Sequence, residues 1–372
     1  RFYKTLPLAR TVGAFDGSTI VGTLGEFDFD VAVPGGAEVR MAGTTIVTVR
    51  PTHRRRGVLR SMMQLHLDTA HRRGDPLAGL WASETAIYGR FGFGLCADSH
   101  EIDLDARHVT LPPAPAGVVV DMIEGDEAST IIPGLYAELR GQHAGGLSRS
   151  DAWWEHRRFY DPEHYREGAS ARRYAVARRD GAPVGYVMYR QKEKWDDFVP
   201  NGTISIIEVF AADEGARRAL WSFLTNIDLF PNVNWWNAPI DEPMVWEASN
   251  RRQVRRKIGD TLWLRILDVP SALSARTYEI DYSLVVAVVD DKGGYAAGTY
   301  ELAVSGGAAA CRATDRVAEL KVDIEDLGAL YMGGRSAHNL WRAGRIDGDE
   351  DLVLRADRLF RTTVPPWCPE VF

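Results

Sequence analysis

Arginines gather at one point of an otherwise acidic chain, in the stretch VRPTHRRRGVLRSMM of residues 49–63. Three of them, at positions 54–56, directly precede Gly57 and the start of a helical pattern. The first N–H groups of a helix have no intrahelical partner, and the helix dipole is positive at that end. Glycine lets the backbone approach a ligand closely, and arginine forms charge-assisted bonds with oxyanions. The pattern is typical of a phosphate site. A solvated basic helix start is the alternative.

The segments around this run predict the elements that position it. Apolar and polar residues alternate over residues 8–49, as in antiparallel strands joined by glycine-containing turns. A helix is expected from about residue 58 to 71, because apolar residues recur on one face there. A short apolar strand follows at 76–82, and Ser83 is expected to cap a second helix. The basic turn therefore joins a strand to an amphipathic helix.

Residues 204–227 repeat this plan of strand, turn and amphipathic helix. Where the first copy has its arginine run, the second has Glu214-Gly215-Ala216. We therefore predict a degenerate internal duplication whose second copy lacks the anion site. The proline-rich stretch 111–117 is typical of a linker between the copies, and the last hundred residues change again, to strands followed by helices.

Composition excludes several classes of protein. The chain has 372 residues and a formal net charge of -7, so no global positive field favours nucleic acid. No apolar run is long enough for a membrane span, and no signal-peptide pattern is present. Cys96, Cys311 and Cys368 lack metal-ligand spacing and indicate buried or incidental thiols in a reducing compartment. We expect a cytoplasmic protein with no metal and with neither a membrane nor a nucleic-acid partner.

Two motifs together resemble those of the GNAT acyltransferases. The strand TTIVTV, the turn RPTHRRRG and the helix after it are similar to the motif with which these enzymes grip the pyrophosphate of acetyl-CoA. ASETAIYGRFGFG resembles their second motif, with Tyr88 followed by Gly92-Phe93. Leu59 departs from the generic pattern, which has a small residue there. With this departure the motifs are similar to a narrower group, the enhanced intracellular survival family, which acetylates aminoglycosides at several amines.

The resemblance implies a fold class and a domain organisation. The fold would be α+β, with two tandem GNAT-like modules of α/β type, the second degenerate, and a third α+β module similar to sterol carrier proteins. The expected boundaries are 1–112 for the catalytic module, 113–267 for the degenerate module and 268–372 for the third, whose tail would reach the active site. The family also implies a homohexamer.

The resemblance places acetyl-CoA on three segments of the first module, and implies no metal cofactor. Pantetheine is peptide-like and would bind along a splayed strand as an added strand does. The implied contacts are Ile46, Val47 and Val49 on the strand, Arg55, Arg56, Gly57, Val58, Leu59 and Arg60 at the turn and helix start, and Ser83 and Glu84 at the second helix.

Acetyl transfer from a thioester to an amine needs a neutral amine and a proton for the departing thiolate. The phenol of Tyr88 has a reference pKa of about 10 and is protonated at neutral pH, which suits a general acid. Taken alone, Tyr88 is better explained as a packed core residue with a satisfied hydroxyl. The resemblance implies that it is the proton donor.

The proton acceptor in the family is the carboxylate of the last residue, which implies Phe372. The tail TTVPPWCPEVF carries apolar residues suited to docking, and its prolines reduce the entropy lost on docking. An α-carboxylate has a reference pKa of about 3.3–3.7, so burial, a water relay or binding of the neutral amine must assist it. A purely structural tail is the alternative.

Three functions remain open on these grounds. The first is an acetyl-CoA-dependent N-acetyltransferase of aminoglycosides or related polyamines. The second is the same chemistry on protein lysines or small biogenic amines. The third is a lipid-binding or interaction protein with a vestigial GNAT module. The intact turn at 54–57 and Tyr88 favour catalysis, because a vestigial site should resemble the second copy.

Overall fold

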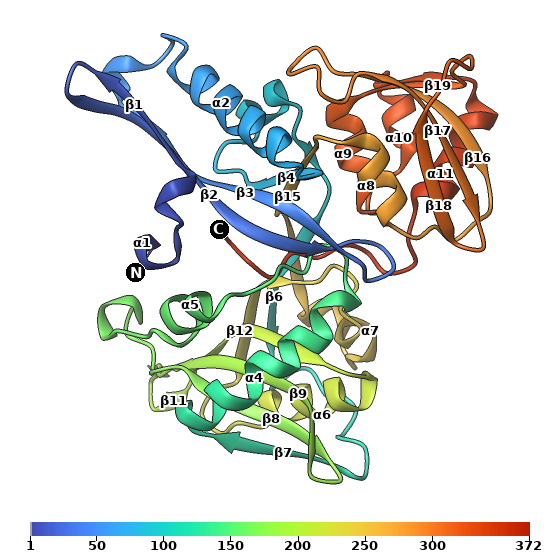
Figure 1. The fold of residues 1–372 in the computed structure, drawn as a ribbon. Coiled ribbons are helices and arrows are strands. Elements are labelled where there is room, and N and C mark those ends of the chain that lie inside the picture. Colours follow the sequence, from blue (N-terminus) through green and yellow to red (C-terminus); the bar gives the residue numbers. More distant parts are fainter. Residues whose placement is uncertain (1) are drawn as a thin grey trace. The chain divides into compact units, whose positions relative to one another are not determined.

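The computed structural model describes residues 2–372 and divides into two compact units (Figure 1). Unit 1 comprises Arg1–Asp98, Gly141–Ser148 and Asp260–Phe372. Unit 2 comprises Ser99–Arg140 and Arg149–Gly259. Each unit is therefore built from segments that lie far apart in the sequence.

Unit 1 contains a six-stranded sheet in the order β1-β2-β3-β4-β15-β5. Its strands are β1 (Thr11–Asp16), β2 (Thr19–Ala32), β3 (Glu38–Val49), β4 (Leu77–Trp81), β15 (Leu262–Ile266) and β5 (Gly94–Leu95). The first three form an antiparallel meander, β4 runs parallel to β3, and β15 is antiparallel to β4. The sheet is thus completed by a strand that follows the whole second copy in the sequence.

The helix α2 (Val58–Arg73) covers one face of this sheet, as the blue part of Figure 1 shows. Its buried residues Met62, Met63 and Leu67 pack with Leu24 of β2 and Ala42 of β3 in one hydrophobic core. The helix predicted over 58–71 is confirmed, and it ends at Gly74 with a left-handed φ of 82°. Two shorter helices of the first module are α1 (Phe2–Thr5) and α3 (Thr85–Tyr88).

The rest of unit 1 is a five-stranded sheet with four helices. The strand order is β18-β17-β16-β19-β20. The elements are β16 (Ser283–Val289), β17 (Gly298–Ser305), β18 (Ala308–Ala313), β19 (Leu320–Asp323), β20 (Ile346–Gly348), α8 (Val269–Ala275), α9 (Ile324–Tyr331), α10 (Ala337–Arg342) and α11 (Glu350–Phe360). Arg265 of β15 and Asp290, both fully buried, form an ion pair of 2.9 Å that ties the two sheets together.

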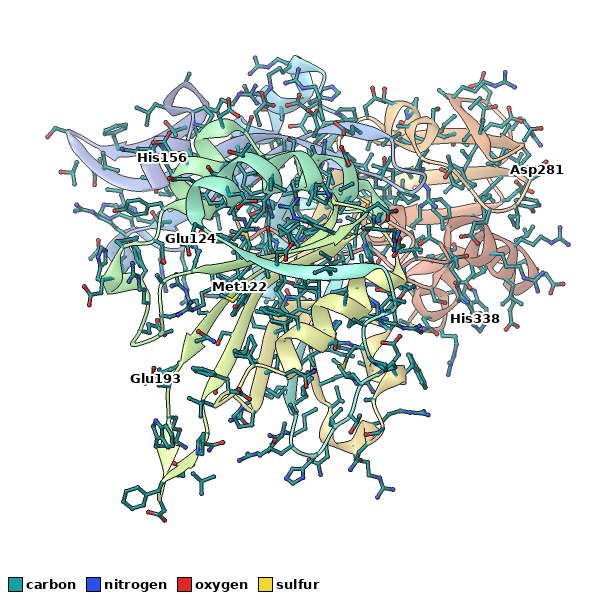
Figure 2. The ribbon with its side chains drawn as sticks, turned by 90° about the horizontal axis from the view of Figure 1, so that it is seen from below. Met122, Glu124, His156, Glu193, Asp281 and His338 are labelled. Carbon is teal, nitrogen blue, oxygen red and sulfur yellow. The ribbon has the colours of Figure 1, made fainter. Side chains whose placement is uncertain are left out.

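Unit 2 contains a seven-stranded sheet in the order β14-β6-β13-β12-β9-β8-β7. Its elements are β6 (Asp98–Asp105), β7 (Val118–Ile123), β8 (Arg173–Arg179), β9 (Ala182–Lys192), β12 (Thr203–Ala211), β13 (Asn232–Ala238), β14 (Arg255–Asp260), α4 (Gly125–Leu139), α5 (Asp151–Trp153), α6 (Glu214–Thr225) and α7 (Met244–Glu247). A two-stranded ribbon, β10 (Trp195–Asp196) and β11 (Val199–Pro200), extends from β9 beyond Glu193 in Figure 2.

The predicted duplication is visible in unit 2, where β12 pairs parallel with β13 and leads into α6, as β3 pairs with β4 and leads into α2. The module boundaries at 112 and 267 stay a prediction. All three cysteines are buried and free, as expected. Within residues 2–372, no helix combines the length and the apolar character needed to cross a membrane.

Candidate functional site

The strands β3 and β4 separate about halfway along β3. They pair only at Met41–Leu77, Ala42–Ala78 and Gly43–Gly79. Beyond that point β3 continues beside β2 as far as Val49, whereas β4 continues beside β15 as far as Trp81. No strand of the described residues fills the resulting opening, so β3 and β4 are unpaired beyond Gly43 and Gly79, where a peptide-like ligand can add as a strand.

A β-bulge lies on β3 at this opening. The pairs Thr23–Thr48 and Gly25–Thr45 leave Ile46 and Val47 together opposite the single residue Leu24. Ile46 has a φ of 42°, a left-handed conformation that costs a β-branched residue about 1–3 kcal/mol. The Thr23 hydroxyl donates to the Ile46 carbonyl at 3.1 Å and so supports the bulge. Such a bulge turns backbone groups out of the ladder, where a ligand can use them.

The start of α2 is positively charged and open. Gly57, at its N-cap, has a φ of 83°, and no side chain caps the helix. A Cβ built on Gly57 meets no atom within 4 Å, so space lies directly outside the helix end. Within residues 2–372, no ion pair engages the arginines at positions 54, 55, 56 and 60. The helix dipole and these guanidinium groups together suit a phosphate.

A cavity of about 940 Å³ joins the opening between the strands to this helix start. Ten of the predicted residues line it, namely Val47, Val49, Arg55, Gly57, Val58, Leu59, Arg60, Ser83, Glu84 and Tyr88. Three predicted residues, Ile46, Arg56 and Phe372, are not among its lining residues. Six lining residues were not predicted as contacts, namely Thr48, His53, Arg54, Ile87, Arg90 and Phe91. Each lies within three positions of a predicted residue along the chain, so sequence proximity was the available signal.

Tyr88 lies at the end of α3 with its ring edge-on to Phe93, at a centroid distance of 6.3 Å. The prediction that Ser83 caps this helix is wrong, because the N-cap is Glu84 and no side chain makes a capping bond. The Ser83 side chain is instead hydrogen-bonded to Tyr88. Burial raises the pKa of the Tyr88 phenol, against the lowering effect of this bond, and the Glu84 charge raises it further. Tyr88 therefore holds its proton at neutral pH, as a proton donor must.

Phe372 docks on β2. Its ring meets that of Phe29 at a centroid distance of 5.0 Å and an angle of 67°, and in Figure 1 the red end of the chain lies beside β2. On the same strand, Glu26 is paired with His66 of α2 at 3.1 Å. Because side chains alternate along a strand, Phe29 points to the face opposite α2. Tyr88 belongs to the hydrophobic core on the α2 face, so Tyr88 and the Phe29 contact of Phe372 lie on opposite faces of the sheet.

The second copy has no comparable anion site. Its helix α6 is capped by Asp213, whose carboxylate accepts from the Ala216 N–H at 3.0 Å. Hydrogen bonds from Arg179 and from the Ala216 backbone lower the pKa of Asp213 to about 2. The predicted loss of the site in this copy thus has a structural cause, since a built-in carboxylate stands at the helix start.

In the second copy, a buried ion pair between Arg149 and Glu208 lies at the bulge of β12. The fully buried Glu208 accepts from Arg149 at 2.6 and 3.0 Å and from the Tyr186 hydroxyl at 2.8 Å. Burial opposes ionisation, yet Arg149 and Arg158 lower the pKa of Glu208 to about 2. Beside its bulge the second copy therefore has a buried ionic cluster.

Outside this cavity, the further candidates for a site are the histidine His338 and clusters of metal-ligating side chains. His338 of α10, labelled in Figure 2, stacks on Trp341 and is 3.2 Å from the Glu350 carboxylate, which is a structural environment. Among residues 2–372, no group of three or more histidine, cysteine, aspartate or glutamate side chains is placed to hold a metal ion.

Comparison with known families agrees with the tandem order. A model described as an acetyltransferase (GNAT) domain matches residues 1–96, and another of the same description matches residues 145–266. A sterol carrier protein domain matches residues 269–369. The predicted fold class, with two GNAT modules and a sterol-carrier-like third module, is confirmed.

Individual relatives cover almost the whole chain. A Streptomyces avermitilis protein described as an uncharacterized N-acetyltransferase is 38% identical over 366 residues, which is 98% of this chain and 89% of the relative. The N-acetyltransferase Eis of Mycobacterium tuberculosis is 34% identical over 364 residues, or 95% and 86% of the two chains. The crystal structure of Eis1 from Mycobacterium abscessus has a TM-score of 0.86 at 28% identity, covering 100% of this chain and 92% of that one.

Proposed function

Because the chain belongs to the Eis family of GNAT N-acetyltransferases, we propose that its first module transfers acetyl groups from acetyl-CoA to the amines of aminoglycosides or related polyamines. The cavity that connects the arginine-rich helix start with Tyr88 carries this proposal. This cavity extends from the start of α2, where the phosphates would bind, to Tyr88, which would donate the proton.

Acetyl-CoA would be held along the opening of the sheet. Its phosphates would lie at the start of α2, near Arg55, Gly57, Val58, Leu59 and Arg60, with Arg56 adding long-range charge. Its pantetheine would pair with the backbone of Ile46, Val47 and Val49, whose bulge turns those groups outward. Ser83 and Glu84 border the cavity where the thioester would lie. The bound molecule supplies the acetyl thioester.

Tyr88 would give its proton to the departing sulfur, and the carboxylate of Phe372 would take one from the attacking amine. A carbon–nitrogen bond forms and a carbon–sulfur bond breaks, so the two transfers balance. The two side chains occupy opposite faces of the sheet, and the opening between β3 and β4 is where groups on both faces can meet. This arrangement supports a donor and an acceptor on either side of the acetyl group.

The direct test is release of free thiol when the protein is mixed with acetyl-CoA and kanamycin, followed with a thiol-reactive dye. We expect turnover that depends on both substrates. Spermidine, a small biogenic amine and a lysine peptide, offered separately, distinguish the acceptor classes. If acetyl-CoA is turned over with the peptide alone, acetylation of protein lysines is the correct assignment. No turnover with any acceptor contradicts the proposal.

The family also supports a homohexameric, cytoplasmic enzyme that needs no metal and has no nucleic-acid or membrane partner. Light scattering coupled to size exclusion measures the assembly directly. A mass of six chains is the expected result, and activity that survives chelators is expected alongside it.

A further inference from the structure

Residues 141–148 interrupt unit 2 in the sequence but belong to unit 1. Gly145 donates its N–H to the Ala32 carbonyl, and Ala32 donates its own to the Gly146 carbonyl, both at 2.8 Å. Two further 2.8 Å bonds join Asp30 of β2 to Ser148, one in each direction. These bonds lay the segment antiparallel along β2, beyond the end of the pairing between β2 and β1 at Gly25.

The same segment holds the C-terminal tail. The Trp367 N–H donates to the Ala144 carbonyl at 2.8 Å, and the His143 ring meets the Trp367 ring edge-on at 5.6 Å. Gly145 has a φ of +104°, and a Cβ at this position would lie 2.8 Å from the Trp367 carbonyl oxygen. Both its conformation and its close approach to the tail therefore require glycine at position 145.

A second contact fixes the end of the tail. The Phe372 ring packs on Phe29, and these side chains are 8% and 4% exposed. A Cβ at Gly43 would lie 2.6 Å from the Phe29 ring, so that ring lies over Gly43 of β3. Gly43 is the last residue of β3 that pairs with β4. Phe372 is thus held beside the point where β3 and β4 separate.

We propose that residues 143–146 and Phe29 form a two-point tail clamp that positions the terminal carboxylate for proton transfer. The clamp holds the tail at Trp367 and at Phe372, and so restricts the short segment between them. Reaction geometry of this kind is sensitive to displacements of about 1 Å. This inference rests on the proposed role of the carboxylate as proton acceptor. It gives the segment that interrupts unit 2 a part in the chemistry of the first module.

The test uses Gly145→Ala in the full chain. Its matched control is Gly344→Ala, because Gly344 also lies in unit 1, has a φ of +73° and has no atom within 4 Å of an added Cβ. Carboxypeptidase release of Phe372 under native conditions reports docking of the tail. We expect release to accelerate by about tenfold or more in Gly145→Ala and to stay at the wild-type rate in the control, because only the first disturbs Trp367.

Kinetics then show whether docking serves the reaction. In Gly145→Ala we expect kcat at about pH 7 to fall by at least about tenfold, with the KM for acetyl-CoA unchanged. The deficit should shrink towards about pH 9, where more amine is neutral without a base. Phe29→Ala should behave likewise, and Phe29→Leu should recover most of the activity because it restores an apolar platform.

Other outcomes distinguish docking of the tail from its role in proton transfer. If Phe372 stays protected in both Gly145→Ala and Phe29→Ala, there is no clamp. If Phe372 is released while kcat and its pH profile stay at wild-type values, the clamp exists but does not position a base, and the inference is overturned. Failure of the proposed function looks different, because the wild-type protein itself would then transfer no acetyl group.

Discussion

Arg179 holds the carboxylate of Asp213 with both terminal nitrogens, at 2.6 and 2.9 Å, at the start of α6. The equivalent helix start of the first module, at Gly57, has arginines and no acidic residue in its first turn. The start of α6 therefore already has an anion, the carboxylate of Asp213, whereas the start of α2 has positive charges that can bind an anion. This contrast makes the cofactor assignment testable within a single chain.

Changing Arg55 to Ala should weaken acetyl-CoA binding by about 1.5–3 kcal/mol, since a charge-assisted bond to phosphate is lost. Arg56→Ala should have the smaller effect, because Arg56 does not line the cavity. Calorimetric titration with acetyl-CoA measures both. Arg179→Ala serves as the control from the second copy and should leave the affinity unchanged. An equal loss of acetyl-CoA affinity in the control would contradict the assignment of the cofactor to the first module.

Tyr88→Phe should bind acetyl-CoA almost normally and lose about 10²–10⁴-fold in kcat, the usual contribution of a general acid. The substitution removes only the hydroxyl from a buried ring, so a folding defect is not expected. Steady-state rates with a saturating acceptor provide the measurement. Wild-type turnover in this variant would make Tyr88 a packing residue.

Ser83→Ala should move the alkaline limb of the kcat profile to higher pH. The hydrogen bond with Ser83 lowers the pKa of Tyr88, so its removal raises that pKa and keeps the phenol protonated over a wider range. Rates measured between about pH 7 and pH 10 would reveal the shift. A limb that stays in place means that Tyr88 does not control it.

One residue added after Phe372, or a C-terminal tag, should strongly reduce kcat, because the carboxylate becomes an amide and the charge moves away. Deletion of Phe372 should be equally harmful, whereas Phe372→Leu should retain most activity through an apolar contact with Phe29. A tag at the N-terminus is the control. A C-terminally tagged protein with full kcat/KM would assign the proton to another acceptor, such as ordered water.

Glu208→Gln should destabilise unit 2 by about 3–5 kcal/mol, because the buried charge of Arg149 loses its partner. The folded pKa of Glu208, about 2, lies below its ordinary value of 4.5, so the stability from this pair is present above about pH 4.5 and is lost as the pH falls towards 2. Urea unfolding at neutral pH and near pH 3 should show the wild-type advantage shrinking in acid. An advantage independent of pH would contradict this account.

Local features of the site could be predicted from the sequence, and contacts between distant segments could not. The turn at Gly57 and the helix after it are set by neighbouring residues, so periodicity and turn chemistry predicted them. Ser83 lies one residue before the N-cap Glu84 and its side chain interacts with Tyr88, a placement that capping preferences do not predict. Ile46 is also among the residues least expected in a left-handed conformation, so only pairing with β2 reveals the bulge.

The place of β15 in the six-stranded sheet has a consequence for synthesis of the chain. The strand β4 ends at Trp81, whereas its antiparallel partner β15 ends at Ile266, which is 185 residues later in the sequence. At about 5–20 residues per second, a ribosome needs about 10–40 s to deliver that partner. The long segment 149–259 of unit 2 is translated in this interval, while LAGLW is exposed as an apolar strand edge. The nascent chain therefore passes through a stage in which its six-stranded sheet is open on one side, and expression of residues 1–112 alone would make that aggregation-prone stage permanent.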